Sequence, residues 1–265
     1  MIRVGVIGAY GRMGREVCRA VAEDPECVLV AAVDRAGCGE TVGPLIGHPD
    51  VTAQISEELE TLTDAEVDVA VDFTHPDEVM DNIRWCVRHA VDVVVGTTGL
   101  GSADLDEIRG LIEEEGSESN VFVAPNFAIG AVLMMRFAAA ASRWLPSLEI
   151  IELHHDGKAD APSGTALKTA EEVAKARPDA SSPPASKEVV PGVRGGEVAG
   201  IRVHSVRLPG LVAHQEVILG GPGQSLTIRH DSYDRASFMP GVLLAIKSIM
   251  KHPGLTYGLE TLLDL

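Results

Sequence analysis

Two adjacent histidines and a nearby lysine are the side chains of this chain best suited to acid–base chemistry. His154, His155 and Lys158 follow a short apolar stretch, residues 148–153, whose composition predicts a β-strand, so they stand in the loop beyond it. An imidazole titrates near pH ~6.5 and donates a proton near neutrality, whereas an ammonium with a pKa of ~10.4 is a fixed positive charge. We therefore expect a histidine to donate a proton and Lys158 to hold a carboxylate.

The residues after Lys158 predict the start of a helix. Ser163 and Thr165 can each supply the hydroxyl that caps it, and apolar residues then recur at helical spacing through position 174. The first backbone N–H groups of such a helix, at Gly164 and Thr165, would face an anion. The histidines, the lysine and the helix start together predict a site for a small, doubly anionic substrate.

A metal site and a solvated loop are the alternatives for this segment. Adjacent side chains of an extended chain point to opposite faces, and neither a CxxC nor an HExxH spacing accompanies the two histidines. A solvated loop accounts for any one of these residues but not for the whole group. The sequence therefore favours acid–base chemistry, and we expect no metal.

The start of the chain has the pattern of a dinucleotide site. Residues 2–7 predict a buried strand, Gly8, Gly11 and Gly14 predict a tight turn, and the residues after them predict a helix. Glycines at such a turn let a pyrophosphate approach the helix N-terminus, where the macrodipole favours negative charge. The spacing is G-x-x-G-x-x-G rather than the stricter G-x-G-x-x-G, so the pattern is weak on its own.

The end of the next strand bears on the choice of cofactor. Residues 28–33 predict a strand that leads into Asp34, near the place where an acid meets the adenosine ribose. Asp34 suggests a hydrogen bond to a free 2′-hydroxyl and hence NADH, whereas Arg35 can pair with the 2′-phosphate of NADPH. A polar residue that only closes the strand is the alternative for Asp34. The sequence therefore permits both cofactors.

Two further strand ends are expected beside the nicotinamide. Residues 67–73 and 91–95 predict strands, and the second leads into the loop 96–99, which reads Gly-Thr-Thr-Gly. Ligands of doubly wound sheets lie beyond the carboxyl ends of the strands. Taken alone, this loop would be an ordinary turn.

The histidine segment resembles the signature of a known family. Residues 152–166 match the pattern E-x-H-H-x-x-K-x-D-x-P-S-G-T-A of the dihydrodipicolinate reductases, also called 4-hydroxy-tetrahydrodipicolinate reductases. The resemblance spans practically the whole chain. The matching residues are Glu152, His154, His155, Lys158, Asp160, Pro162, Ser163, Gly164, Thr165 and Ala166.

The resemblance implies an activity and an assembly. It implies an NAD(P)H-dependent oxidoreductase that converts 4-hydroxy-tetrahydrodipicolinate, or the dihydrodipicolinate formed by its dehydration, to tetrahydrodipicolinate in lysine and diaminopimelate biosynthesis. It also implies a homotetramer. On this basis we expect His154 to be the general acid and Lys158 the second catalytic residue. We expect His155, Gly164 and Thr165 to bind the substrate carboxylates.

The resemblance also indicates the cofactor contacts. Tyr10 is excluded from them, because the family usually has a small residue at this point of the glycine turn and a ring there would crowd the phosphates. The expected cofactor-binding residues are Gly8, Gly11, Arg12, Met13, Asp34, Arg35, Gly96, Thr98, Ala124 and Phe127.

Element order predicts an α/β chain with two domains. Strands alternate with helices through residue 124, which predicts a Rossmann-type, doubly wound parallel sheet. Later strands, over residues 148–153, 201–208, 212–219 and 224–230, predict an α+β domain with an open mixed sheet, the last three as an antiparallel meander. Residues 177–200 predict a mobile connection. We expect a dinucleotide-binding domain over 1–126 and 236–265, and an inserted substrate-binding and tetramerisation domain over 127–235.

Composition limits the class of protein. The chain has 265 residues, 45% of them hydrophobic, and a formal net charge of −17, which disfavours nucleic acid as a partner. We find no apolar run of the ~18 residues that a membrane span needs and no signal-peptide pattern, so we expect a cytoplasmic protein without a membrane partner. An amino-acid dehydrogenase of the aspartate family and a non-catalytic dinucleotide sensor are the alternative functions. Neither requires the histidine and Ser-Gly-Thr segment.

Overall fold

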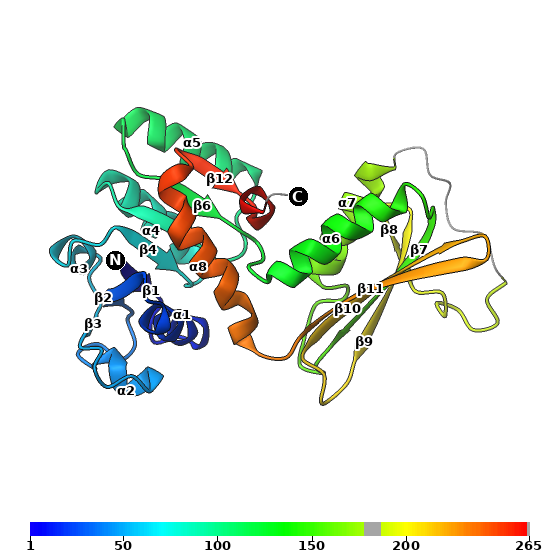
Figure 1. Cartoon of the computed structure of the whole chain (residues 1–265), viewed down its shortest axis with the longest axis horizontal. Helices are drawn as coiled ribbons and strands as arrows, with labels where there is room; N and C mark the ends of the chain where they lie inside the picture. Colours follow the sequence, from blue (N-terminus) through cyan, green and yellow to red (C-terminus); the bar gives the residue numbers. More distant parts are fainter. Residues whose placement is uncertain (178–186, 264–265) are drawn as a thin grey trace. The chain divides into compact units, whose positions relative to one another are not determined.

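The computed structural model describes residues 1–177 and 187–263 and divides the chain into two compact units. Figure 1 shows both. The N-terminal unit consists of Met1–Phe127 and Phe238–Leu265, and the central unit is Ala128–Ser237. The chain therefore leaves the N-terminal unit once and returns to it for its last segment.

The N-terminal unit is built on a seven-stranded sheet in which every neighbouring pair is parallel. The strand order is β12-β6-β5-β4-β1-β2-β3, and the order 3-2-1-4-5-6 within it is that of dinucleotide-binding folds. The predicted Rossmann-type sheet is confirmed. The strands are β1 Ile2–Ile7, β2 Cys27–Val33, β3 Ile55–Ser56, β4 Val69–Asp72, β5 Asp92–Val95, β6 Val121–Val123 and β12 Leu255–Tyr257.

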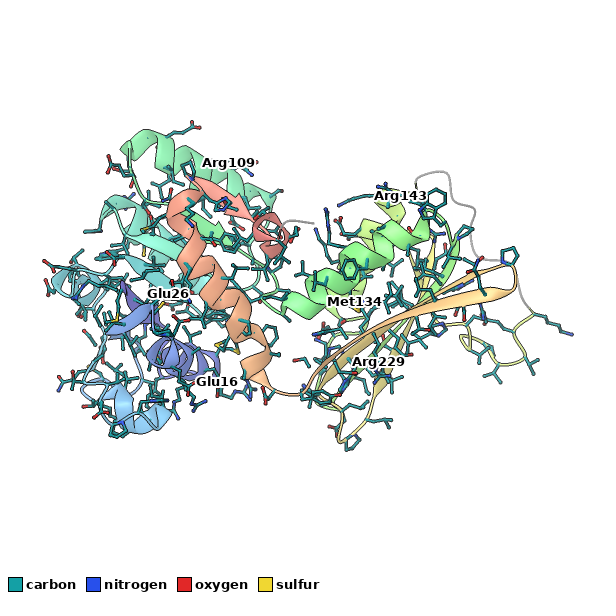
Figure 2. All side chains as sticks on the ribbon, viewed as in Figure 1. Glu16, Glu26, Arg109, Met134, Arg143 and Arg229 are labelled. Atoms are coloured by element: carbon teal, nitrogen blue, oxygen red, sulfur yellow. The ribbon has the colours of Figure 1, made fainter. Side chains whose placement is uncertain are left out.

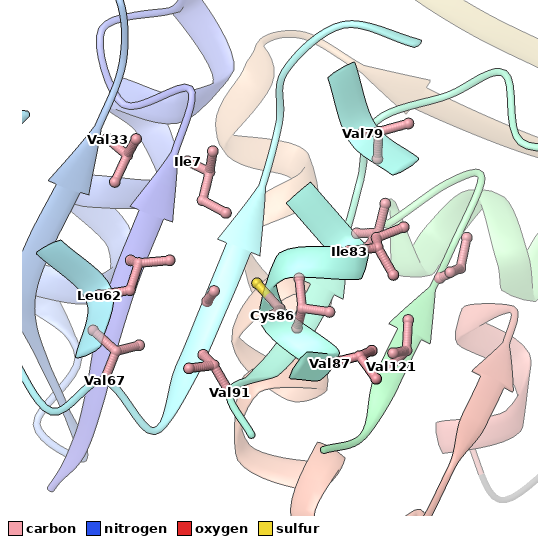
Figure 3. Close-up of a cluster of buried hydrophobic side chains, with 14 of the residues drawn as sticks. Ile7, Val33, Leu62, Val67, Val79, Ile83, Cys86, Val87, Val91 and Val121 are labelled. Carbon is pink, nitrogen blue, oxygen red and sulfur yellow. The ribbon is translucent and has the colours of Figure 1, made fainter. Parts of the chain in front are cut away.

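Helices pack on this sheet through apolar side chains at helical spacing. Val79, Ile83, Cys86 and Val87 of α4 lie on one helix face and pack with strand residues such as Ile7 (Figure 3). α1 and α8 pack against each other and against the sheet. The helices are α1 Arg12–Glu23, α2 Val42–Ile46, α3 Glu60–Asp64, α4 Pro76–Arg88, α5 Ser102–Glu115 and α8 Met239–Ser248, with short 3₁₀ turns η1 Arg235–Phe238, η2 Ile249–Lys251 and η3 Leu259–Leu262.

The segment after α8 adds one more strand to this sheet. β12 pairs with β6 in parallel, Thr256 opposite Phe122, and forms one edge of the sheet. A strand of three residues shows too little alternation to be recognised in a sequence. The pairing ties the end of the chain to the N-terminal unit.

The central unit contains a mixed five-stranded sheet, as predicted. Its strands are β7 Ser147–His154, β8 Gly196–Val198, β9 Ile201–Arg207, β10 Ala213–Gly221 and β11 Gln224–Ser232, in the order β11-β10-β7-β9-β8. β10 and β11 form an antiparallel hairpin, but β9 pairs in parallel with β7 and not with β10. The predicted three-stranded meander is therefore wrong. The crossover between the parallel strands β7 and β9 includes the helix α7, Gly164–Ala176, and β7 separates β9 from β10 in the sheet.

Two helices pack against the sheet of the central unit. These are α6 Ile129–Ser142 and α7 Gly164–Ala176, and Met134 of α6 lies in the resulting core together with Ile150 of β7 and Val173 of α7 (Figure 2). Of the predicted connection 177–200, residues 178–186 lie outside the described residues. Part of the remainder is the strand β8, which the sequence did not predict.

Candidate active site

The glycine turn lies where the strand order of the first sheet reverses, between β1 and β4. Gly8 has a φ of +85°, and a Cβ at this residue would come within 2.4 Å of the Phe73 carbonyl oxygen beyond β4. A Cβ at Gly14 would come within 1.9 Å of the Gly8 carbonyl oxygen. Side chains are thus excluded here by the backbone itself, which leaves the N-terminus of α1 open to a ligand at the usual switch-point position.

Asp34 fastens the turn to the end of β2. Its Oδ2 accepts a hydrogen bond from the Tyr10 N–H at 2.9 Å, and its Oδ1 accepts one from the Ala36 N–H at 2.8 Å. An ionised carboxylate has about four acceptor positions, so two remain for a ribose hydroxyl. Asp34 is therefore more than a polar residue that closes the strand.

The ring of Tyr10 packs against protein groups. The Arg15 guanidinium lies 4.2 Å from its centroid, and the ring lies so close to Gly37 that an added Cβ there would overlap it. Tyr10 does not line the cavity at the glycine turn described below. The Tyr10 ring is therefore held against Arg15 and not in the cavity lining.

A cavity of about 540 Å³ opens at this turn. Such a volume suits part of a dinucleotide. Gly8 and Gly11 contribute from the turn, Asp34 and Arg35 from the end of β2, and Thr74 from the loop beyond β4. The absence of Cβ atoms at the turn and the acceptor at Asp34 fit the pyrophosphate and ribose of a dinucleotide.

A buried carboxylate joins the loops beyond β4 and β5. Oδ1 of Asp72 accepts hydrogen bonds from the hydroxyls of Thr97, at 2.6 Å, and Thr74, at 2.8 Å. Its Oδ2 accepts one from Asn82 at 2.7 Å. Burial raises the pKa of Asp72, and the hydrogen bonds from Thr97, Asn82 and Thr74 oppose that effect only in part. Both loops expected beside the nicotinamide are thereby held together.

The second group of chemical residues is organised by a fully buried carboxylate on β7. Glu152 has no exposed side-chain surface, and its Oε2 lies 2.5 Å from Nδ1 of His154. Arg207 at the end of β9 donates from both terminal nitrogens to the two carboxylate oxygens, each at 2.8 Å. The Ser163 N–H donates to Oε1 at 3.3 Å. Glu152 therefore connects the histidine to the start of α7.

The charge states of this group follow from its surroundings. Burial raises the pKa of Glu152, but hydrogen bonds from Arg207, Ser205 and His154 outweigh it, so the pKa lies below its ordinary value. Burial also lowers the pKa of His154, and the opposing effect of Glu152 does not fully compensate. At neutral pH Glu152 is thus ionised and accepts the Nδ1–H of a neutral His154, which leaves Nε2 for another partner.

The remaining predicted substrate residues lie around the same loop. The Nζ of Lys158 is 2.7 Å from Oδ1 of Asp160, and its side chain is 23% exposed. His155 is exposed. Ser163 provides the capping hydroxyl, accepting from the Ala166 N–H at 3.3 Å. Gly164 begins α7 with open space beside its Cα, and Thr165 follows it. The loop and the start of α7 therefore place Lys158, His155 and a helix N-terminus after the same end of β7.

Comparison with known proteins identifies the family. The model of the dihydrodipicolinate reductase N-terminus matches residues 2–127, and that of the C-terminus matches residues 130–263. The chain belongs to the dihydrodipicolinate reductase family. Members of this family are NAD(P)H-dependent oxidoreductases with a dinucleotide-binding domain.

Individual relatives cover the full length of the chain. The 4-hydroxy-tetrahydrodipicolinate reductase of Nocardia farcinica is 51% identical over 100% of this chain and 99% of its own length. That of Syntrophomonas wolfei is also 51% identical, over 98% of each. The dipicolinate-bound dihydrodipicolinate reductase of Paenisporosarcina sp. TG-14 is 44% identical, with a TM-score of 0.87 over 99% of this chain and 100% of that one. The sequence resemblance to the dihydrodipicolinate reductases is confirmed.

The expected cofactor residues fall into two groups, those that line the cavity at the turn and those that do not. Gly8, Gly11, Asp34 and Arg35 line the cavity at the turn. The others do not line it. Arg12 is exposed at the first position of α1, next to Met13. Gly96 and Thr98 lie in the loop beyond β5, and Ala124 and Phe127 lie beyond β6.

Phe127, one of the predicted cofactor residues, is buried among other aromatic side chains. Its side chain is 2% exposed, and its ring centroid lies 6.0 Å from that of Phe73 and 6.2 Å from that of Phe122. A ring in this position packs the ends of neighbouring strands together. Its contribution to a bound dinucleotide would be indirect.

Three side chains that organise these sites were not predicted from the sequence. Arg207 and Asp72 carried no motif signal. Glu152 belonged to the signature pattern without an assigned role. The register explains Arg207, because His154 is its partner across the parallel pair β7 and β9. That pairing cannot be read from residues more than 50 positions apart, whereas Glu152, two residues before His154 on the same face of a strand, carried a usable signal.

The described part of the chain contains neither a cluster of metal ligands nor a membrane-spanning helix. Over residues 1–177 and 187–263, no group of three or more His, Cys, Asp or Glu side chains is arranged to hold a metal ion. The helices of these same residues include none with the length and apolar character of a membrane span.

Proposed function

We propose that this protein reduces 4-hydroxy-tetrahydrodipicolinate, or the dihydrodipicolinate formed from it, to tetrahydrodipicolinate with NADH, NADPH or both. The observation that carries the proposal is that the Glu152-bound His154 stands in one segment with the Lys158 ammonium and the start of α7. The dipicolinate-bound relative supports a cyclic dicarboxylate as the ligand. The step belongs to lysine and diaminopimelate biosynthesis.

The residues proposed to hold the cofactor provide shape and polar contacts. Gly8 and Gly11 admit the pyrophosphate to the N-terminus of α1, and Asp34 accepts a ribose hydroxyl. We assign Arg12, Met13, Arg35, Gly96, Thr98, Ala124 and Phe127 to the same dinucleotide, with Phe127 acting through packing. The nicotinamide, when bound, supplies the hydride that adds at C4 of the unsaturated ring.

His154 supplies the proton that completes the reduction. Glu152 accepts Nδ1–H and so directs Nε2 toward the substrate. Burial keeps the pKa of His154 low, but a dianionic substrate close to the ring favours the charged imidazolium and raises that pKa. Binding of the substrate thus produces the protonated form of His154 that the reaction requires. The imidazolium then donates its Nε2 proton to the ring that has accepted hydride.

Lys158 and the start of α7 hold the two carboxylates. The Lys158 ammonium exchanges Asp160 for a substrate carboxylate, while His155, Gly164 and Thr165 contact the second. Asp160 is 58% exposed, so the existing ion pair is weak and readily exchanged.

Replacement of Lys158 with alanine tests this clamp. We expect KM for the dicarboxylate to rise about tenfold or more and kcat to fall by a similar factor, because a group that positions the ring acts in both the ground and transition states. Steady-state kinetics at fixed NADH measure both. Glu172→Ala is a matched control, since Glu172 pairs with other lysines on α7, and it should leave both constants unchanged. Unchanged dicarboxylate affinity in Lys158→Ala would contradict the assignment.

One assay tests the proposed function as a whole. Freshly made product of the preceding synthase is added to the protein with NADH or NADPH, and absorbance at the reduced nicotinamide band is followed. We expect oxidation that depends on the synthase product, with inhibition by dipicolinate. Oxidation with an amino acid or its semialdehyde instead would favour a dehydrogenase of the aspartate family, and cofactor binding without turnover would favour a sensor.

We further propose a cytoplasmic homotetramer assembled through the sheet of the central unit. Ile218 of β10 is 36% exposed and points away from the face that carries the buried Val217 and Leu219, and an apolar side chain on that outer face favours burial against another copy. The excess of acidic residues disfavours binding of nucleic acid by such an assembly.

A further inference from the structure

The cavity at the glycine turn, which Asp34 helps to line, is strongly acidic. Four carboxylate residues line it, namely Asp34, Glu57, Glu78 and Asp81. Among the described lining residues, Arg35 is the single arginine or lysine. The local charge is therefore unfavourable for an additional phosphate.

The single cation is itself paired. Nη2 of Arg35 lies 2.5 Å from Oε2 of Glu78 in the first turn of α4. The arginine side chain is 79% exposed and that of Glu78 is 37% exposed, so the pair contributes little to stability. It nevertheless places a carboxylate on the guanidinium group that a 2′-phosphate would need.

We propose that Glu78 is a specificity-determining residue that makes this enzyme prefer NADH, by occupying Arg35 and repelling a 2′-phosphate. This inference rests on the proposed function and specifies its cofactor. A 2′-hydroxyl requires only the acceptor positions left on Asp34, which the Tyr10 and Ala36 amides keep in place. A 2′-phosphate adds nearly two negative charges beside four carboxylates, and Glu78 is the one of the four in contact with Arg35.

Binding titrations with the intact protein test the proposal without relying on turnover. Tyrosine and tryptophan fluorescence or calorimetry gives Kd for NADH and for NADPH at fixed low ionic strength. We expect the wild-type protein to bind NADPH about tenfold or more weakly than NADH, and Glu78→Gln to tighten NADPH about fivefold while NADH changes by less than about twofold. Added salt should narrow the difference in the wild type, because it screens the repulsion.

A matched control separates this contact from a general loss of charge. Asp77→Asn removes one carboxylate from the same turn of α4, where Asp77 lies near His75 and does not line the cavity. It should leave the NADPH-to-NADH ratio unchanged. Equal wild-type affinities, or an unchanged ratio in Glu78→Gln, would overturn the proposal while the reductase function stands. Failure of both cofactors to bind would overturn the function and the proposal together.

Discussion

Replacing His154 with glutamine is expected to lower kcat by a factor of about 10² to 10³ while Kd for NADH changes by less than about twofold. Glutamine has a similar reach and can still contact Glu152, but it has no proton to transfer at neutral pH. The effect should therefore appear in the chemical step. Stopped-flow single turnovers with saturating NADH measure that step directly.

The neighbouring histidine provides the control for this prediction. His155 is exposed, and the histidine that Glu152 holds is His154, so His155→Gln should raise KM for the dicarboxylate more than it lowers kcat. The opposite order of effects would move the proton-donor role to His155. A near-normal kcat in His154→Gln would move it to His155, to Lys158 or to water.

Removal of the Arg207 charge is expected to destabilise the protein by about 3 to 5 kcal/mol, because Arg207→Met leaves a fully buried Glu152 without its bidentate partner. The remaining carboxylate then gains a proton more easily, and it holds His154 less well. Urea unfolding measures the stability, and steady-state kinetics should show a lower kcat in the same variant.

Two further variants test whether the loss of stability in Arg207→Met comes from the broken pair with Glu152 or from the loss of any arginine. Arg229→Met removes another arginine from the same sheet, one that is 44% exposed and pairs with Asp231 and Glu216 (Figure 2). Because this arginine is exposed, its removal should cost much less stability than Arg207→Met. The double variant Glu152→Gln, Arg207→Met removes both charges of the pair and should recover most of the stability without recovering activity. Equal costs for Arg207→Met and Arg229→Met would contradict the account.

The parts of the fold that the sequence predicts are those with local signals. Strand β1, Gly8 and helix α1 form a contiguous pattern, and Ser163 caps α7 as its hydroxyl and position suggest. Strand pairing across long separations has no comparable local signal. For this reason the sequence predicted an antiparallel meander, whereas β9 pairs in parallel with β7.

The functional residues were likewise predictable where they carry a local sequence signal. His154 and Lys158 stand in a signature segment, so their types and spacing indicate the chemistry. What holds them depends on tertiary register, since Arg207 reaches Glu152 only because β9 lies beside β7. The buried Asp72 network likewise depends on Thr97 and Asn82 meeting one strand end, which the folded sheet alone brings about.

The charge state of His154 in the presence of a dicarboxylate is the most direct test of the proposed mechanism. An NMR titration of the imidazole, with His154→Gln to assign its signals, gives the pKa with and without bound dipicolinate. The account predicts a pKa below the ordinary histidine value in the free protein, caused by burial, and a clear upward shift when the dianion binds. A pKa that stays unchanged or falls on binding would contradict His154 as the proton donor.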